Sequence, residues 1–320
     1  MSAMHDAPAP APTPAQRRSL RICICTCRRN GPLERLLAAI ERNAKLLDPS
    51  IDVGIVLVDD DPGQAAVSVA EQWSPRFALG LRYEATGSGS VSIARNRGIE
   101  SGIVDADLLA WIDDDCEPSD EWLVSLVDVL DRFDADAATG WCTDVPSDDA
   151  PGWLSSEPFL ERTEGRVDGQ RIDIAATKNF MVRAPWLRDH PDQRFDLSLG
   201  RLGGEDMVFF YRAVDAGLHI RYAERAKVYE RVPEHRTSYR YRVMRECWMG
   251  NSEFVTNYLT GRASRSQLAR RGAKRMIKGA LHPVLATKAG RGPQFRYAAA
   301  TIVRGGAIVA GCLGARMRHH

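Results

Sequence analysis

Two carboxylates stand at positions 113 and 115, directly after an apolar run, in the stretch WIDDDCEP (111–118). At the end of a strand, Asp113 and Asp115 can share one hard divalent cation. Mg²⁺ in proteins commonly takes one or two carboxylates together with the phosphates of a substrate. The stretch therefore predicts a site for Mg²⁺ or Mn²⁺. The alternative is a solvated acidic loop, because runs of charge usually lie on the surface.

A second pair of acids opens an apolar run in GGEDMVFFYRA (203–213). Gly203 and Gly204 precede Glu205 and Asp206, and glycine allows a ligand to approach the backbone closely. A carboxylate in this position could act as a general base. The alternative is that both acids only complement the dipole at the start of a helix.

The stretch GSGSVSIARNRGIE (87–100) places glycines before a helical pattern that contains Arg95. Glycines ahead of a helix can cradle a phosphate, and an arginine can pair with a phosphate or with the edge of a base. The glycine spacing matches neither a Walker loop nor GxGxxG. A flexible turn explains these glycines equally well.

Three cysteines alternate in RICICTCRRN (21–30), so Cys23, Cys25 and Cys27 share one face of a strand. Zinc sites normally need four ligands, often in paired spacing, and no Cys or His partner lies nearby in the sequence. We interpret Cys23 and Cys25 as packing residues. Seven cysteines in 320 residues, without a framework spacing, favour a reducing compartment.

The elements that must position these residues follow from the alternation of strand-like and helix-like patterns. Strands are expected within 20–27, 51–62, 79–85 and 107–115, and helices within 32–47, 64–74, 90–102 and 119–133. Such alternation predicts an α/β fold with a mostly parallel sheet flanked by helices. Ligands bind beyond the carboxyl ends of the strands in these sheets, which is where Asp59–Asp61 and Asp113–Asp115 fall.

Charge is unevenly distributed, although the net charge is only +1. Residues 236–320 hold 17 Lys and Arg against two acids, Glu246 and Glu253. A strongly basic region implies an anionic partner, either a nucleic acid or the cytoplasmic face of a membrane. Since no nucleic-acid-binding module or zinc spacing is recognisable, we expect no nucleic acid and favour an anionic membrane surface. A solvated basic surface is the alternative.

The stretch YAAATIVRGGAIVAGCLG (297–314) is apolar but contains Arg304 and four glycines. A spanning helix needs about 20 apolar residues, and a charge at its centre is costly. We expect an interfacial helix or a packed C-terminal helix instead of a span.

The motifs ICTCRRN, VLVDDDP, SIARNRG, WIDDDCEP, TKNFMVR and GGEDMVFF occur in this order. Together they resemble the family 2 glycosyltransferases, in particular the bacterial enzymes of the succinoglycan and exopolysaccharide type. The resemblance covers about residues 20–250 and implies the Rossmann-like GT-A fold. It implies metal-dependent transfer of a sugar, with inversion, from a nucleotide-sugar donor to a sugar or lipid-linked acceptor in polysaccharide or glycolipid assembly.

The resemblance also assigns roles to residues of this sequence. The residues implied on the nucleotide-sugar side are Thr26, Cys27, Arg28, Asp59, Asp60, Arg95, Asn96, Asp113 and Asp114. Asp113 and Asp115 are implied as metal ligands. Asp206 is implied as the catalytic base, with Glu205 beside it, and the acceptor side is implied at Asn179, Gly203 and Gly204. His235, in VPEHRTS, is a further candidate for the metal or the diphosphate, although a lone His in an Arg-rich stretch usually does neither.

The chain is expected to divide into three parts. Residues 1–18, rich in Ala and Pro and without an apolar signal segment, are expected to be a disordered leader. Residues 19–235 are expected to form the catalytic domain, with a nucleotide-binding half (19–135) and an acceptor-binding half (136–235). Residues 236–320 are expected to be a basic helical region that holds a cytoplasmic protein on the inner face of the cell membrane.

Three departures from the family pattern matter. Cys27 stands where an aromatic residue is usual, which puts stacking of the base in doubt. Lys178 replaces the usual glycine before Asn179 and could meet a phosphate or lie on the surface. The Gln-x-x-Arg-Trp motif of processive synthases is absent, which favours one transfer per binding event.

Two alternatives come from other classes. A nucleotidyltransferase acting on sugar phosphates would normally carry a glycine-rich loop ending in Arg or Lys after the first strand, and RRNGPLERL does not supply one. A non-catalytic nucleotide-sugar-binding protein would not need Asp113, Asp115 and Asp206 intact.

Overall fold

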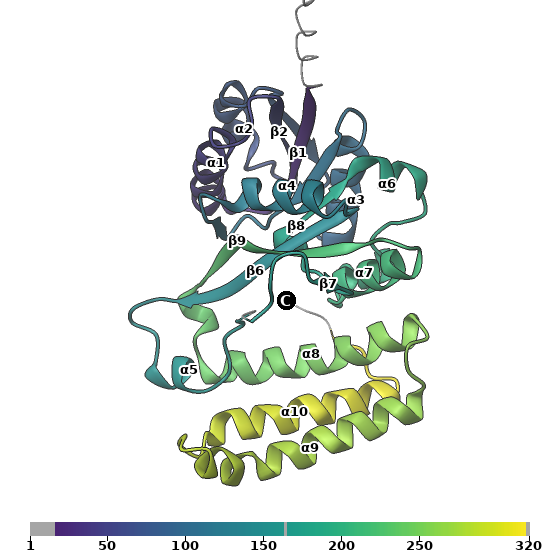
Figure 1. Ribbon diagram of the computed structural model, residues 1–320. Coiled ribbons are helices and arrows are strands. Elements are labelled where there is room, and N and C mark those ends of the chain that lie inside the picture. Colours follow the sequence, from purple (N-terminus) through teal and green to yellow (C-terminus); the bar gives the residue numbers. More distant parts are fainter. Residues whose placement is uncertain (1–16, 163–164, 318–320) are drawn as a thin grey trace, which may run out of the picture.

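An α/β body above three long C-terminal helices makes up the computed structural model, which describes residues 17–162 and 165–317 (Figure 1). The predicted disordered leader, 1–18, lies outside the described residues as far as residue 16. Arg17 pairs with Asp52 at 2.8 Å, and Arg18 already begins the first strand.

The first part of the body is the expected alternation of strands and helices. Its strands are β1 (Arg18–Thr26), β2 (Ile51–Asp59), β3 (Leu81–Ala85) and β4 (Leu108–Trp111). They pair in parallel in the order β3-β2-β1-β4. The helices are α1 (Asn30–Ala44), α2 (Val67–Trp73), α3 (Val91–Gly102) and α4 (Trp122–Arg132). Parallel pairing brings the carboxyl ends of β1, β2 and β4 to one edge.

The sheet is covered on both faces, because alternate side chains of its strands point to opposite sides. Leu20, Ile22 and Ile24 of β1 pack in one core with α1, α2 and α4. Cys23 packs in a second core with α3 and α7 (Glu205–Asp215), and Cys25 borders that core. Burial raises the pKa of the Cys25 thiol to about 12. The interpretation as a packing residue is confirmed for Cys23, whereas Cys25 packs at the border of the core and also lines a cavity.

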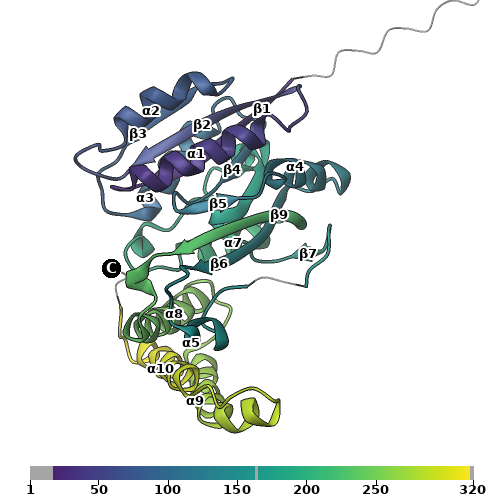
Figure 2. The ribbon, with the colours of Figure 1, turned by 90° about the vertical axis from the view of Figure 1, so that its left-hand side faces the viewer.

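The second part of the body adds antiparallel pairs. The strands β5 (Cys116–Pro118), β6 (Ala137–Pro146), β7 (Arg171–Ile172), β8 (Phe180–Arg183) and β9 (Ile220–Val232) extend the sheet as β4-β8-β6-β9-β5, with β7 on β9. β8 runs antiparallel to β4 and β6, whereas β6 and β9 are parallel. Figure 2 shows β9 crossing the lower body. The helices here are α5 (Gly152–Ser156), α6 (Ala184–Asp189) and α7. Short 3₁₀ turns lie at Ser74–Arg76, Thr177–Asn179, Leu197–Leu199 and Glu234–Arg236.

The C-terminal region consists of α8 (Tyr239–Leu259), α9 (Arg265–Lys288) and α10 (Phe295–Cys312). α10 lies against both other helices. Glycines allow α9 and α10 to touch backbone to backbone: a Cβ on Gly272 would lie 2.7 Å from the carbonyl oxygen of Gly305. Phe254 and Val255 of α8 share a small core with Leu199 and Val208 of the body, so this layer is packed onto the body.

Within the described residues, no helix is long and apolar enough to cross a membrane. The stretch 297–314 forms most of α10, which packs against α8 and α9 and so agrees with the expected packed C-terminal helix. Its Arg304 is matched by Glu246 and Glu253 of α8, at 3.3 and 3.1 Å. The predicted α/β fold, with a mostly parallel sheet flanked by helices and a helical C-terminal region, is confirmed.

Candidate functional site

A cavity of about 610 Å³ lies at the carboxyl ends of β1 and β4. The end of β1, the start of α3 and the acidic loop after β4 form much of its wall, and β9 and the turn after it complete it. The lining residues are Cys25, Thr26, Cys27, Arg29, Asp60, Gly89, Val91, Ala94, Arg95, Asp113, Asp114, Asp115, Glu230 and Arg236. The sheet thus gathers charged groups at the edge where α/β folds bind ligands.

The three consecutive acids of the loop have different environments. Asp114 is buried, and it accepts hydrogen bonds from Thr26 Oγ1 (2.8 Å) and Arg29 Nη1 (3.0 Å). Asp115 also accepts from Arg29 Nη1, at 2.9 Å. Asp113 is the most open of the three and lies 3.6 Å from Arg95 Nη2. Asp113 and Asp115 are therefore available to a ligand, while Asp114 holds the loop to β1.

The cavity wall carries an excess of carboxylate around Asp115. Burial raises the pKa of Asp115 to about 6, and Glu230, Asp113 and Asp114 add to the shift by repulsion. Glu230 is held by Lys178 Nζ (3.0 Å) and by Arg236 (3.3 Å). A bound cation would relieve this repulsion, so Asp113 and Asp115 fit a divalent ion that completes its coordination with substrate phosphates.

The described residues contain no cluster of three His, Cys, Asp or Glu side chains close enough to hold a metal by themselves. His235 is exposed in the turn Glu234–Arg236 and does not line the cavity. Its ring lies against Tyr241, with 6.2 Å between ring centroids. This geometry gives the predicted role of His235 as a ligand no support, and its neighbour Arg236 reaches the cavity instead.

The second pair of acids starts α7. Gly203 and Gly204 both have left-handed φ angles (76° and 89°), which favour glycine. Glu205 is buried and pairs with Arg95, which also faces Asp113. Asp206 is half-buried and accepts a hydrogen bond only from the backbone of Met207 (2.7 Å) among the described residues. Glu205 therefore fixes Arg95, and Asp206 is the carboxylate left for proton transfer.

The pKa of Asp206 is raised to about 6, first by burial and second by the neighbouring charge of Glu205, against the attraction of Arg95. The negative charge of Asp113 also contributes to raising the pKa of Asp206. A carboxylate with such a pKa is a better proton acceptor than an ordinary aspartate at neutral pH. The position suits a general base.

Of the two predicted acids at the end of β2, Asp59 and Asp60, only Asp60 lines the cavity. Asp59 is fully buried and accepts from the backbone of Asp61 and Ala66 and from the Tyr83 hydroxyl, each at 2.9 Å. Both its oxygens are occupied, so Asp59 organises the loop and does not line the cavity, and contact with a base finds no support here.

Asp60 does reach the wall. It holds the loop 86–90, accepting from Thr86 Oγ1 at 2.7 Å and from the backbone of Ser88 at 2.6 Å.

Two other predicted residues serve the fold in this structure, and a third lines the cavity. Asn96 exchanges two hydrogen bonds with the backbone of Phe195, at 2.9 and 2.8 Å, away from the cavity. Arg28 has a left-handed φ of 58° and pairs with Asp61 at 2.8 Å, while the adjacent Arg29 enters the cavity wall. Cys27 is exposed and lines the cavity.

Asn179 is the clearest case of a motif residue that is structural. It is fully buried, accepts from Trp122 Nε1 (2.9 Å), and donates to the carbonyl oxygens of Trp141 (2.9 Å) and Ala226 (2.8 Å). These bonds close the bulge between β6 and β9, where a Cβ on Gly140 would lie 2.0 Å from the Ala226 oxygen. Contact of the Asn179 side chain with an acceptor is not compatible with this arrangement, because its amide is fully engaged.

Sequence reasoning missed Arg29, Glu230 and Arg236, and neither of its two alternatives for Lys178 agrees with the structure. Lys178 is neither a surface residue nor open to a phosphate, since its Nζ lies 3.0 Å from both Glu161 and Glu230. Burial alone would lower the pKa of Lys178, but these two carboxylates outweigh it and raise the pKa. The only local signal was the replacement of the usual glycine by a lysine.

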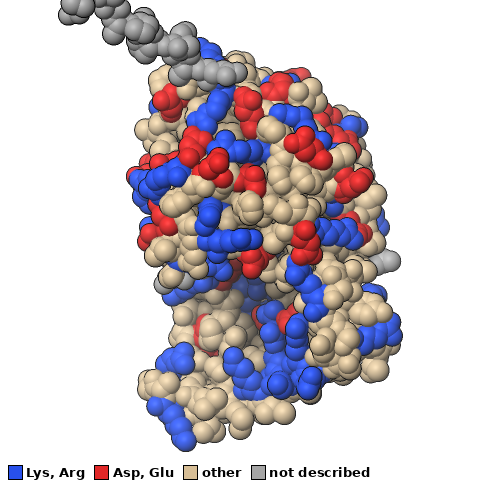
Figure 3. Space-filling view, turned by 45° about the vertical axis from the view of Figure 1, so that its right-hand side comes forward, with Lys and Arg blue, Asp and Glu red and all other residues tan. Residues whose placement is uncertain are grey.

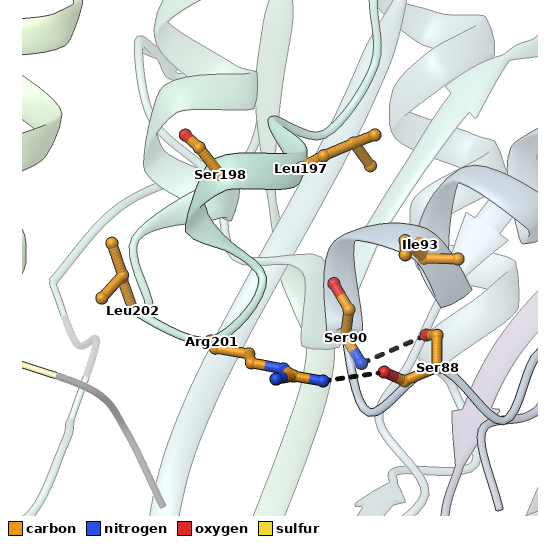
Figure 4. A pocket seen from close by; sticks show the side chains of 7 residues that line it. All are labelled: Ser88, Ser90, Ile93, Leu197, Ser198, Arg201 and Leu202. Carbon is orange, nitrogen blue, oxygen red and sulfur yellow. Dashed lines mark hydrogen bonds between the residues drawn. The ribbon is translucent and has the colours of Figure 1, made fainter. Parts of the chain in front are cut away.

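A second, smaller cavity of about 400 Å³ adjoins the loop 86–90 on the side of the segment 197–202 (Figure 4). Arg201 crosses to this loop and donates to the carbonyl oxygens of Ser88 (3.1 Å) and Gly89 (3.2 Å). Three hydroxyl groups line the cavity, those of Ser88, Ser90 and Ser198. The segment 197–202, which forms one side of this cavity, is followed directly by Gly203 and Gly204.

Two curated proteins share sequence with this chain. ExoM of Rhizobium meliloti, a succinoglycan biosynthesis protein, is 30% identical over 211 residues, which are 65% of this chain and 64% of ExoM. A glucosyl-dolichyl phosphate glucuronosyltransferase of Haloferax volcanii is 24% identical over 190 residues, covering 54% of this chain and 58% of that protein. The chain thus spans less than two thirds of either relative.

Solved structures share the fold. S. aureus TarS, residues 1–349, in complex with UDP-GlcNAc superposes with a TM-score of 0.54 at 14% identity, over 88% of this chain and 90% of that one. GalNAc-T7 with UDP, GalNAc and Mn²⁺ gives a TM-score of 0.54 at 13% identity, over 75% of this chain and 51% of that one. At these identities the likeness concerns the fold.

A family model gives the assignment. The model of glycosyl transferase family 2 matches residues 21–190, which is more than half of the chain and includes Thr26, Asp60 and Asp113–Asp115. Glu205 and Asp206 lie beyond the matched residues, at the start of α7, where Glu205 pairs with Arg95 of the cavity wall. With this match, the chain belongs to glycosyl transferase family 2.

Proposed function

We propose that this protein transfers a sugar, with inversion, from a nucleotide-sugar donor to an acceptor hydroxyl. The observation that carries the proposal is that Asp113, Asp115 and Arg95 line one cavity while Arg95 also pairs with Glu205, the residue next to Asp206. Complexes of TarS with UDP-GlcNAc and of GalNAc-T7 with UDP support a nucleotide-sugar donor in the same fold.

The donor diphosphate belongs beside the acidic loop. Asp113 and Asp115 would hold a Mg²⁺ or Mn²⁺ ion, which when bound offsets the charge of the leaving nucleoside diphosphate. Arg29 fixes Asp115, and Arg236 adds positive charge to the wall. Thr26, Cys27 and Asp60 then border the nucleotide. Mn²⁺ in the GalNAc-T7 complex is consistent with this chemistry.

Proton transfer falls to Asp206. Its carboxylate takes the proton from the acceptor hydroxyl while the oxygen bonds to the anomeric carbon and the bond from that carbon to the phosphate oxygen breaks. One displacement inverts the configuration, and no second carboxylate need form a covalent intermediate. The Arg95–Glu205 pair keeps Asp206 and Asp113 at the same site.

The acceptor is proposed to enter from the side of Gly203 and Gly204, where the hydroxyl-lined cavity of Figure 4 adjoins the loop 86–90. The names of the two curated relatives support a polysaccharide or lipid-linked acceptor. A lipid-linked acceptor would place the protein on the inner face of the cell membrane through its basic C-terminal region. The absent processive motif supports one transfer per binding event.

Release of nucleoside diphosphate from a panel of nucleotide sugars, with Mn²⁺ or Mg²⁺ and then with EDTA, tests the proposal. We expect release with at least one donor and its loss in EDTA. If no donor binds or is cleaved under any condition, the proposed function is wrong. Release that persists unchanged in EDTA would remove the metal from the proposal and leave the transfer.

A further inference from the structure

The C-terminal helices enclose a groove of about 680 Å³ that the proposed reaction does not use. α10 contributes Tyr297, Thr301 and Arg304, and α8 and α9 supply the sides. Figure 3 shows Lys and Arg side chains gathered on this lower part of the molecule, around a hollow below the body. We call the groove between α8, α9 and α10 the basic groove; its basic residues are Arg271, Lys274, Arg275, Lys278, Arg291 and Arg304.

The basic groove has a surplus of positive charge. Six Lys and Arg line it against two acids, Glu246 and Glu253. Both acids are already paired, since Glu253 lies 3.1 Å from Arg275 and from Arg304, which also reaches Glu246 at 3.3 Å. The cations Lys274, Lys278 and Arg291 have no carboxylate partner among the described residues. Such a groove selects a ligand with phosphate-like charge.

An exposed apolar stripe runs along α9, the helix that also supplies Lys274 and Lys278 to the basic groove. Ile277, Leu281, Val284 and Leu285 of α9 are each between 53 and 60% exposed. Their spacing places them on one side of the helix, and Leu285 also lines the basic groove. The opposite side of α9 is the one buried against its neighbours, through Leu268, Gly272, Gly279 and Ala286.

We propose that this surface docks on an anionic phospholipid bilayer, with lipid phosphates in the basic groove and the apolar stripe in the interface. Interfacial helices combine aliphatic residues on one side with Lys and Arg beside them. A single-stranded nucleic acid would need aromatic platforms for its bases, whereas this stripe is aliphatic. A free phosphate would leave the stripe without a partner. The inference deepens the membrane location given under the proposed function, and it rests on that function only for the lipid-linked acceptor.

The experiment is sedimentation of the full chain with phosphatidylcholine vesicles and with vesicles containing equal parts of phosphatidylcholine and phosphatidylglycerol. We expect binding to the anionic vesicles only. Each Lys near such a surface contributes about fivefold in binding, so Lys274→Ala/Lys278→Ala should weaken it about 30-fold. Ile277→Ser/Leu281→Ser should weaken it at least about tenfold, because two partly exposed apolar side chains no longer insert. All four side chains are exposed, and thermal melts check that the variants fold.

The matched control is Arg35→Ala/Arg42→Ala on α1, which removes the same charge from the body; it should change binding less than about twofold. Equal loss in the control and the Lys variant, or full binding by the Ile277→Ser/Leu281→Ser variant, would overturn the docking surface. The docking surface would also be overturned if the chain does not bind vesicles but is stabilised by inorganic pyrophosphate or binds a short RNA.

A thermal shift of the same wild-type preparation with UDP separates this proposal from the proposed function. A chain that binds UDP but no vesicle refutes the docking surface alone. One that binds vesicles but neither binds nor cleaves any donor refutes the transferase alone.

Discussion

The cavity of the body and the basic groove are both rich in charge, but they balance it in opposite ways. In the cavity each of Arg29, Arg95 and Arg236 is paired with a carboxylate, but five acids line the wall against these three arginines, so negative charge is in excess. In the groove both acids are paired and lysines remain. The sign of this surplus, more than the number of charges, matches the ligand that we propose for each site: a cation with a diphosphate in the first, and lipid phosphates in the second.

The largest expected effect tests the base. Asp206→Asn removes the proton acceptor and should lower the rate of transfer by about 10² to 10⁴, while the affinity for nucleotide stays within about threefold. Initial rates at saturating donor and calorimetric titration with UDP measure both quantities. Asp120→Asn, an exposed acid of the body, is the control and should keep full activity. Loss of nucleotide binding in Asp206→Asn would assign Asp206 to the fold instead.

Arg95 tests whether the pairing of charges in the cavity supports the fold. Arg95→Met leaves Glu205 buried without its partner, which should lower the free energy of unfolding by about 3 to 5 kcal/mol. Urea denaturation measures the loss. Adding Glu205→Gln should recover part of it.

Arg97 on the same helix offers a matched control, since it is half-exposed and its acids lie 3.5 to 3.6 Å away. Arg97→Met should cost less than about 1 kcal/mol. Equal costs for Arg95→Met and Arg97→Met would show that the buried pair has no special weight.

The surplus carboxylate predicts a dependence of stability on pH. The pKa of Asp115 is raised from 3.8 to about 6, so its ionised form opposes folding above pH 6, and this cost disappears as the pH falls toward 4. Asp115→Asn should therefore stabilise the free protein by about 1 to 2 kcal/mol at pH 7.5 and by only about a third of that at pH 4.5, where most of the cost has gone. Thermal melts at the two pH values measure this, and destabilisation at pH 7.5 would contradict the repulsion.

The smallest expected effect lies in the basic groove. Glu253→Gln frees Arg275 and Arg304 and should lower stability by less than about 1 kcal/mol, because the carboxylate is partly exposed. Binding to anionic vesicles should rise by a few fold at most. Weaker vesicle binding in this variant would show that the acid shapes the groove instead of opposing its ligand.

The sequence predicted which strand ends would meet, because local alternation fixes the order of the parallel elements. Thr26, Asp60 and Asp113–Asp115 reach the cavity for this reason. Asn96 and Asn179 show the limit: both are motif residues, yet their amides are engaged by backbone groups 99 and 38 to 47 residues away. Nothing local encodes such partners, and a motif does not tell a residue that binds substrate from one that holds the site in shape.

Arg29 and Glu230 were missed, and the pairing of Lys178 was not predicted, for the same reason. Glu230 meets Lys178 only because β9 folds back beside β6, and the antiparallel β8 carries Lys178 into that contact. The pairing of these strands depends on contacts across the sheet. Arg29, and not the predicted Arg28, lines the cavity because Arg28 has a left-handed φ just after β1 and pairs with Asp61 instead.

The turn at Gly204 has a consequence for how this protein can be divided. A Cβ there would lie 2.6 Å from Thr256 of α8, and Ser252 of the same helix donates to the Leu202 carbonyl oxygen at 3.2 Å. Helix α8 is thus the back wall of the turn that aims Asp206. A truncation at residue 235, where composition changes, would remove the helix that packs against this turn, so we expect it to disturb the position of the proposed base Asp206.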